Sequence, residues 1–248
     1  MTGSFSCTTS NLSGGCPSSG TYGTSIDGGA NQAAYVIQDA WNPAFALISQ
    51  TVSANNMSDW QVKADMAAGN RAVLSYPDAQ DTVTDTSDNP VPFGDYASII
   101  STFATQMPSD VGTAGAADDY EAAYDLWLGH DGANYDQEIM VWTDDHNQVP
   151  AGSDTGATWT DPLTGVVYEI WAGNNDDPVT LVAKSNMTMG AVDLSSLFSW
   201  LRSNGYSDET GINQLDFGFE LCSTSGRTET FDVTDYTLDA TCTSGDSC

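Results

Sequence analysis

Glu138, Glu220 and Asp125 are the residues of this chain best placed for acid–base chemistry. Each lies in a segment in which polar and apolar residues alternate, and successive side chains of a β-strand point to opposite faces. Because the apolar face of such a strand packs against the core, the three carboxyl groups are expected to point away from it. The apolar residues that alternate with them are Leu126, Leu128, Ile139, Val141, Phe217, Phe219 and Leu221.

Large side chains that could contact a sugar are predicted on the same face as the acids. They are Trp127, Met140 and Trp142. Residues 129–135 form a short connection that contains glycine, so a hairpin could place Asp125 opposite Glu138. Acids beside tryptophans suit a groove in which sugar rings stack on aromatic rings while carboxyl groups act between them.

Two carboxyl groups that flank one glycosidic bond can hydrolyse it. When they lie about 5–5.5 Å apart, one attacks the anomeric carbon and forms a covalent intermediate, while the other protonates the leaving oxygen and later activates water. The acid needs a raised pKa, which burial and a neighbouring carboxylate both provide. Glu138 and Glu220 are the candidates for this pair, and Asp125 could hydrogen-bond the nucleophile and hold its rotamer.

Short strands are the elements expected to position these residues, because Gly, Ser, Thr and aromatic residues are frequent. The predicted strands are Gln32–Gln38, Arg71–Tyr76, Tyr120–Leu128, Asp136–Trp142, Val166–Ala172, Thr180–Lys184, Gln214–Cys222 and Thr230–Leu238. The acidic stretch Asp81–Pro92 is predicted to be one long surface loop, since Pro90 and Pro92 exclude a central strand.

One segment has the period of a helix instead. In residues 193–203, apolar side chains recur at helical spacing. Asp193 can cap its start, and Gly205 stands where a helix would end. Many strands and one helix predict an all-β sandwich of two antiparallel sheets with one packed α-helix. No linker or repeat interrupts the chain, so residues 1–248 are expected to form a single catalytic domain.

The charge of the chain restricts its partners. The net charge is −29, with 34 acidic and 5 basic residues. Nucleic acids and acidic membranes would be repelled, whereas a neutral polymer would not. No segment approaches the roughly 20 apolar residues of a membrane span. Residues 1–20 lack the basic and apolar parts of a signal peptide, and a mature secreted, extracellular chain is expected.

Cysteine usage also fits an extracellular setting. None of the five cysteines forms C-x-x-C, and there are only two histidines, so neither a metal site nor another cofactor is expected. Two disulfides are the better interpretation. Cys7–Cys16 and Cys242–Cys248 would each close a short loop and leave Cys222 free, although the sequence alone does not fix the connectivity.

Six motifs, in order along most of the chain, resemble glycoside hydrolase family 12, the compact endoglucanases and xyloglucanases. The most specific is Glu138-Ile-Met-Val-Trp142, which resembles the nucleophile motif of that family. The others are Tyr35–Trp41, Leu74–Pro77, Ala123–Trp127, Leu197–Tyr206 and Phe217–Glu220.

The resemblance implies a fold and a set of roles. The fold is a β-jelly-roll sandwich with an open cleft across one sheet, and the activity is endo-cleavage of β-1,4-linked glucan chains with retention and without a metal. The resemblance assigns the nucleophile to Glu138, the acid/base to Glu220 and the supporting carboxylate to Asp125. It assigns cleft contacts to Trp41 and Met140. A β-1,4-linked glucan is then the expected partner of a monomeric enzyme.

One departure from the family pattern leaves the substrate open. The family commonly has two asparagines before its early tryptophan, whereas Asp39 and Ala40 precede Trp41 here. Xyloglucan, mixed-linkage glucan or xylan are alternative substrates of a related enzyme. A carbohydrate-binding sandwich without catalysis is the alternative from another class, and the two glutamates favour the enzyme because binding alone requires neither.

Overall fold

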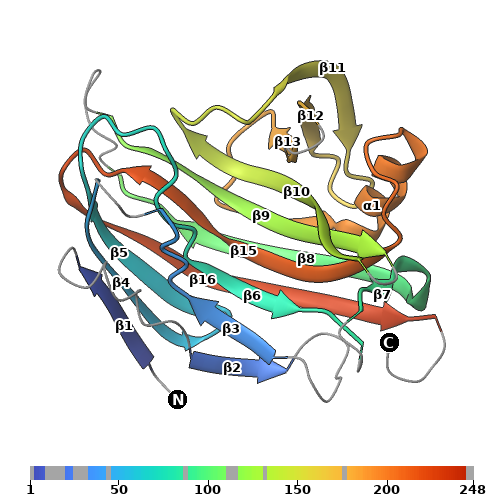
Figure 1. The fold of residues 1–248 in the computed structure, drawn as a ribbon, viewed down its shortest axis with the longest axis horizontal. Coiled ribbons are helices and arrows are strands. Elements are labelled where there is room, and N and C mark those ends of the chain that lie inside the picture. Colours follow the sequence, from blue (N-terminus) through green and yellow to red (C-terminus); the bar gives the residue numbers. More distant parts are fainter. Residues whose placement is uncertain are drawn as a thin grey trace.

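Two sheets pack face to face in the computed structural model (Figure 1). The structure describes residues 3–8, 20–24, 33–42, 46–85, 89–109, 117–130, 133–174 and 178–243. The six-stranded sheet has the order β1 (Gly3–Thr8), β4 (Leu47–Asn56), β5 (Asp59–Met66), β16 (Thr228–Cys242), β8 (Tyr96–Gln106) and β14 (Met189–Asp193). No helix of these residues is long and apolar enough to cross a membrane.

The ten-stranded sheet carries the predicted acids. Its order is β11 (Ser153–Thr160), β12 (Val167–Ala172), β13 (Val179–Ala183), β10 (Ala133–His146), β9 (Asp119–His130), β15 (Gly211–Ser223), β6 (Asp78–Thr82), β3 (Ala33–Ile37) and β2 (Gly20–Thr24), with β7 (Val91–Pro92) paired to β15. The strand pairs of the described residues are antiparallel except β10 with β13, which is parallel. The prediction of a two-sheet sandwich is confirmed.

Alternating apolar residues of the two sheets form the core between them. Phe217 of β15 is fully buried, and its ring lies 5.3 Å from that of Phe103 on β8, 4.7 Å from that of Tyr124 on β9 and 5.5 Å from that of Tyr236 on β16. The predicted inward faces of β9, β10 and β15 are therefore confirmed. Their opposite faces are left to carry the acids.

The helix was predicted at the position where it occurs. Helix α1 covers Leu194–Ser203, and four of its five apolar side chains, all except Trp200, are buried against the sandwich beside β8. Asp193 caps the first turn by accepting a 2.9 Å hydrogen bond from the backbone N–H of Ser196. Gly205 follows the helix with φ of 74°, a conformation that suits glycine.

Two predictions about residues 71–92 were wrong. Residues 71–76 form an extended connection with a single bridge, Ser75 to Leu221, because their N–H groups are divided between β15 and the carbonyl of Asp39. The strand begins only at Asp78, after Pro77. The acidic stretch is not one surface loop, since Asp81 belongs to β6 and is buried. The prolines are accommodated because Pro92 lies in a two-residue strand.

Truncation of Phe217 tests the packing under the acidic face. We expect Phe217→Ala to lower the free energy of unfolding by about 3–5 kcal/mol, because it leaves a cavity among three aromatic rings. Denaturant unfolding followed by fluorescence measures this change. Leu163→Ala, at a half-exposed side chain, is the control and should change the stability by less than about 0.5 kcal/mol. Equal effects of the two substitutions would contradict this description of the core.

Candidate active site

Two of the predicted acids, Asp125 and Glu138, line a cleft on the outer face of the ten-stranded sheet, and Glu220 is not among the described residues that line it. The cavity has a volume of about 390 Å³ and is formed by β3, β6, β9, β10, β15 and the segments that follow β3 and precede β6. These five strands are consecutive neighbours in the sheet (Figure 1). The lining residues are Ile37, Asp39, Trp41, Tyr76, Asp78, Gln80, Asp125, Trp127, Glu138, Gln214 and Asp216.

Strand β9 separates the two candidate catalytic glutamates. Glu138 of β10 pairs with Trp127, and Glu220 of β15 pairs with Glu121. The predicted pairing of Asp125 with Glu138 is wrong by two residues. Asp125 lies opposite Met140 and is therefore the diagonal neighbour of Glu138. A register irregularity between Ala133 and Gln137 explains the shift.

The two candidate catalytic glutamates both have raised pKa values, and Glu220 influences that of Glu138. Burial and the charge of Glu220 raise the pKa of Glu138 to about 7. Burial also raises the pKa of Glu220, and a hydrogen bond with Glu121 lowers it in part. Because the negative charge of Glu220 raises the pKa of Glu138, ionisation of both groups at once is disfavoured. One carboxylate and one carboxylic acid is the state that hydrolysis of a glycosidic bond requires.

Asp125 lies where it can act on both glutamates. Burial raises its pKa well above the usual value, and the negative charges of Glu138, Asp216 and Glu220 raise it further. The indole N–H of Trp127 donates a 3.2 Å hydrogen bond to Asp125 Oδ2. Trp127 therefore positions Asp125 through this hydrogen bond and also lines the cleft.

The four predicted sugar contacts separate into two groups. Trp41 and Trp127 line the cleft, and Trp41 is 60% exposed, so its ring is open to a ligand. Met140 and Trp142 are buried and pack with Ala123 in a small apolar cluster of their own. They are not among the described residues that line the cleft.

Four further carboxyl groups at the site were not predicted as functional: Asp39, Asp78, Glu121 and Asp216. Asp216 shares its face with Glu220, so the same alternation could have identified it. Asp78 follows the Ser-Tyr-Pro segment, which offers no signal of its own. Glu121 reaches the site only through the pairing of β9 with β15, and such a register is not visible in the sequence.

Glu121 is fully buried directly beside Glu220. Neither of its carboxylate oxygens has a hydrogen-bond donor among the described residues. Burial, followed by the charge of Glu220 and the hydrogen bond between the two groups, raises the pKa of Glu121 well above its usual value. A protonated Glu121 can donate to Glu220, which gives the buried acid a partner and holds the Glu220 carboxyl in place.

Cys222 is a free, buried thiol, as predicted. The side-chain amide of Gln148 donates a 2.9 Å hydrogen bond to its Sγ. Burial and the charges of Asp119 and Glu220 raise the pKa of this thiol above its usual range, so it is an unreactive packed group. The proposed disulfides stay predictions, because the side chains of Cys7, Cys16 and Cys248 lie outside the described part of the chain.

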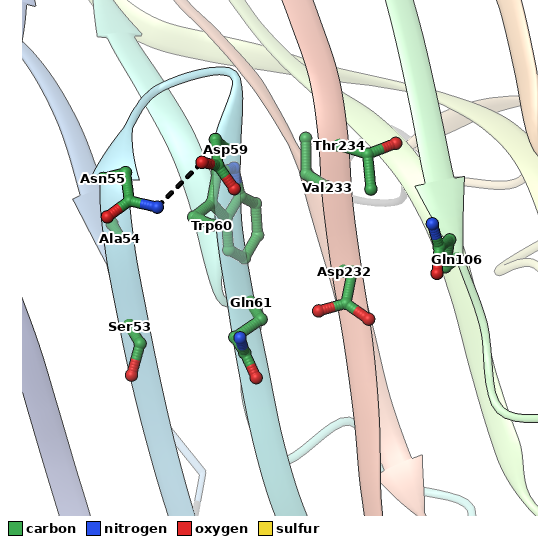
Figure 2. A pocket seen from close by; sticks show the side chains of 10 residues that line it. All are labelled: Ser53, Ala54, Asn55, Asp59, Trp60, Gln61, Gln106, Asp232, Val233 and Thr234. Carbon is green, nitrogen blue, oxygen red and sulfur yellow. Dashed lines mark hydrogen bonds between the residues drawn. The ribbon is translucent and has the colours of Figure 1, made fainter.

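A second hollow of about 420 Å³ lies on the other sheet (Figure 2). Ser53, Gln61, Asp232 and Gln106 form a row of paired residues across β4, β5, β16 and β8. Trp60 offers no ring surface there because it is buried against Phe219 in the core. This polar groove lacks a pair of interacting glutamates, and the cleft on the ten-stranded sheet is the candidate active site.

A sandwich whose outer face carries two glutamates, one of which lines a cleft with an exposed tryptophan, has the features expected of a glycoside hydrolase. The model of glycosyl hydrolase family 12 matches residues 33–241, and the chain belongs to this family. Endoglucanase S of Pectobacterium parmentieri is 27% identical over 131 residues. The chain spans about half the length of this curated relative, since the match covers 48% of each.

Solved structures share the fold. A family 12 xyloglucanase from Bacillus licheniformis in complex with ligand has a TM-score of 0.71 at 18% identity, covering 96% of this chain and 100% of that one. Endoglucanase 3 of Trichoderma harzianum gives 0.71 at 20%, covering 92% and 96%. The xyloglucanase domain of NopAA, a type three effector of Sinorhizobium fredii, in complex with cellobiose gives 0.67 at 19%, covering 90% and 96%.

Substitution of Glu121 tests its effect on Glu220. The acid/base must be protonated in the first step, so activity falls as the pH rises through its pKa. Glu121→Leu removes the hydrogen bond that lowers this pKa, and the basic limb of the pH–activity profile should move to higher pH. The profile of kcat/KM on a soluble β-glucan measures the shift. Glu121→Gln keeps an N–H donor and should shift it less; an unmoved limb in Glu121→Leu would contradict the proposed contact.

The stability of the protein should fall as the pH rises. Burial and a neighbouring acid raise the pKa of Asp39 to about 6 and of Glu138 to about 7, and raise those of Asp78 and Asp216 well above the usual value. A group whose pKa is raised by folding stabilises the protein below its unfolded value, and this is lost as the pH rises through the folded value. The melting temperature should therefore decrease between about pH 4 and about pH 8.

The double variant Asp78→Asn/Asp216→Asn provides the control for this pH dependence. Asparagine does not titrate in this range, so the slope of melting temperature against pH should become smaller. Scanning calorimetry in buffers of equal ionic strength compares the two proteins. An identical slope would show that other groups cause the dependence.

Proposed function

We propose that this protein is a retaining endo-β-1,4-glucanase that cleaves internal bonds of a β-1,4-linked glucan. The observation that carries the proposal is that the charge of Glu220 raises the pKa of Glu138, which lines the cleft together with Asp125 and the exposed ring of Trp41. A cleft open on the surface of a sheet suits a chain that continues at both ends, which favours endo-cleavage. The printed names of the relatives, endoglucanase and xyloglucanase, support the same substrate class.

The proposed reaction has two steps. Glu138 attacks the anomeric carbon, and the bond to the leaving oxygen breaks as Glu220 transfers its proton to that oxygen. Glu220 then takes a proton from water, whose oxygen attacks the anomeric carbon and releases Glu138 as a carboxylate. Each carboxyl group ends in the protonation state in which it began, and the product retains its anomeric configuration.

Asp125 and Trp127 support the nucleophile in this proposal. Asp125 has a raised pKa and is the diagonal neighbour of Glu138, so a protonated Asp125 can donate a hydrogen bond to that group. The bond would fix the nucleophile's rotamer and would weaken as negative charge leaves Glu138 in the first step. Trp41 offers a ring face on which a glucose unit can stack.

The setting proposed for this reaction is outside the cell. We propose that the protein is secreted and acts as a monomer on a polysaccharide too large to enter cells. The acidic composition keeps such a protein soluble and away from nucleic acids and acidic membranes.

Substitution of the two glutamates tests the proposal. We expect Glu138→Ala and Glu220→Ala each to lower kcat on soluble β-glucan by at least about 10³-fold, because each removes a reacting group. Azide should restore turnover to Glu138→Ala and give a product of inverted configuration. Product analysis by NMR on cellohexaose, xyloglucan and β-glucan measures both the configuration and the preferred polymer.

The matched control is Glu229→Ala, at a glutamate on the other sheet whose nearest cation is Arg227. This variant should keep its activity. Wild-type activity in either active-site variant, while circular dichroism shows a folded protein, would reject the assignment. Substrate binding without any cleavage by the wild type would favour a carbohydrate-binding sandwich instead.

A further inference from the structure

The polar groove on the six-stranded sheet has no part in the proposed reaction. Its volume of about 420 Å³ is within the range of pockets that bind ligands, roughly 300–1,000 Å³. The row formed by Ser53, Gln61, Asp232 and Gln106 crosses four neighbouring strands of that sheet, β4, β5, β16 and β8. The cleft lies on the other sheet, so the groove is a separate surface.

Irregularities of the backbone shape this groove on both sides. Asn55 is an extra residue of β4 in its ladder with β5, and Thr234 is an extra residue of β16 in its ladder with β8. Both residues are exposed, and both line the groove. A β-bulge of this kind bends its strand and redirects a side chain, and such bulges are frequent beside functional sites. The groove is therefore a shaped depression and not a flat stretch of sheet.

The side chains of the groove favour a neutral, polar ligand. Two carboxyl groups, Asp59 and Asp232, line it without a lysine, arginine or histidine, so an anion would be repelled. Trp60 is buried in the core, so an apolar ligand finds no ring surface. The groove holds no group of three metal-ligating side chains among the described residues. Its other polar side chains are amides and hydroxyls, which suit a ligand rich in hydroxyl groups.

The row is accessible to such a ligand. Gln61 and Gln106 are exposed, and Asp232 is half-exposed. The hydrogen bond drawn in Figure 2 joins the amide of Asn55 to Oδ2 of Asp59 at 2.7 Å and does not involve the row. Burial and the charge of Asp59 raise the pKa of Asp232. A carboxylate accepts a hydrogen bond from a hydroxyl, and a carboxylic acid can also donate one, so binding requires neither protonation state.

The spacing of the row matches one kind of polymer. Its four side chains occupy directly paired positions, so no register shift separates them. Adjacent strands of a sheet lie about 4.8 Å apart. This distance is close to the length that each glucose unit adds to an extended β-1,4-linked chain. A chain that crosses the strands would therefore meet about one side chain of the row for each sugar unit.

We propose that the polar groove is a second, non-catalytic binding site for an extended β-1,4-linked glucan. The inference rests on the proposed function, because it gives the same polymer to a site on the other sheet. The groove offers hydrogen bonds without an exposed ring, so it binds the glucan more weakly than the cleft does, where Trp41 is 60% exposed. Two sites on one protein raise its apparent affinity for a polymer, because the second contact is intramolecular.

An NMR titration with thio-linked cellohexaose tests the proposal. The sulfur linkages resist hydrolysis, so the wild-type protein can be used. The side-chain amide signals of Gln61 and Gln106 report on the groove, and the indole signal of Trp41 reports on the cleft. We expect both sets of signals to shift, with the groove reaching saturation at a ligand concentration at least about tenfold higher. Maltohexaose, whose α-linked chain is curved, should leave the groove signals unshifted.

Substitutions in the row should remove the second site alone. We expect Gln61→Ala/Asp232→Ala to abolish the shift of the Gln106 amide and to lower the fraction of protein bound to insoluble cellulose by at least about threefold. Its kcat/KM on cellohexaose should stay within about twofold of the wild-type value, because neither residue lines the cleft. Asp239→Ala, at an exposed aspartate of β16 outside the groove, is the matched control and should change none of these measurements.

The outcomes separate this inference from the proposed function. Groove signals that do not shift with thio-linked cellohexaose, or that shift equally with maltohexaose, would overturn the inference and leave the glucanase intact. A Gln106 shift that persists in the folded double variant would also overturn it. If the double variant does not fold, Gln61→Ala and Asp232→Ala give the same comparison singly. If the wild type does not cleave cellohexaose, the proposed function fails, and the groove signals still decide this inference.

Discussion

Repulsion among carboxyl groups on one face of the ten-stranded sheet is the constraint on which the rest of the structure depends. Asp216 pairs directly with Asp125, and Glu220 pairs directly with Glu121. Like charges at directly opposite positions of a sheet destabilise it. The raised pKa values of these groups are the response, because a protonated carboxyl group carries no charge that its neighbour would repel. The same response supplies the carboxylic acid that glycoside hydrolysis needs.

A rigid support is needed to hold such groups together. The acids lie on long central strands, and the opposite faces of these strands are anchored by aromatic rings such as Phe217 and Tyr124. A strand whose inner face is packed cannot slip by one residue without exposing all of its apolar side chains. The core therefore fixes the register, and the register fixes which acids face each other. The core and the candidate site are connected through β9, which pairs with the strands of both candidate glutamates, β10 and β15.

Much of this arrangement could be predicted from alternation within single segments. The inward face of β15 and the outward position of Glu220 follow from four apolar residues at every second position. Strands β4 and β8 were missed because polar residues occupy some of their inward positions: Gln50 of β4 and Ser101 of β8 are buried. The pairing of Glu121 with Glu220 could not be predicted, since it depends on the register between segments about a hundred residues apart.

The positions of the acids depend on Gly218, where the backbone of β6 lies close to β15. It lies between Asp216 and Glu220 on the cleft face and pairs with Asp78. A Cβ at this position would lie 2.2 Å from the carbonyl oxygen of Pro77 and 2.7 Å from Cα of Asp78, so only glycine allows the backbone of β6 to approach. That approach brings Asp78 beside Asp216. Glu220 lies beyond the residues of β15 that pair with β6. The glycine of the Phe217-Gly-Phe-Glu220 motif is thus required for the approach of β6 to β15, in the same motif that carries the candidate acid/base Glu220.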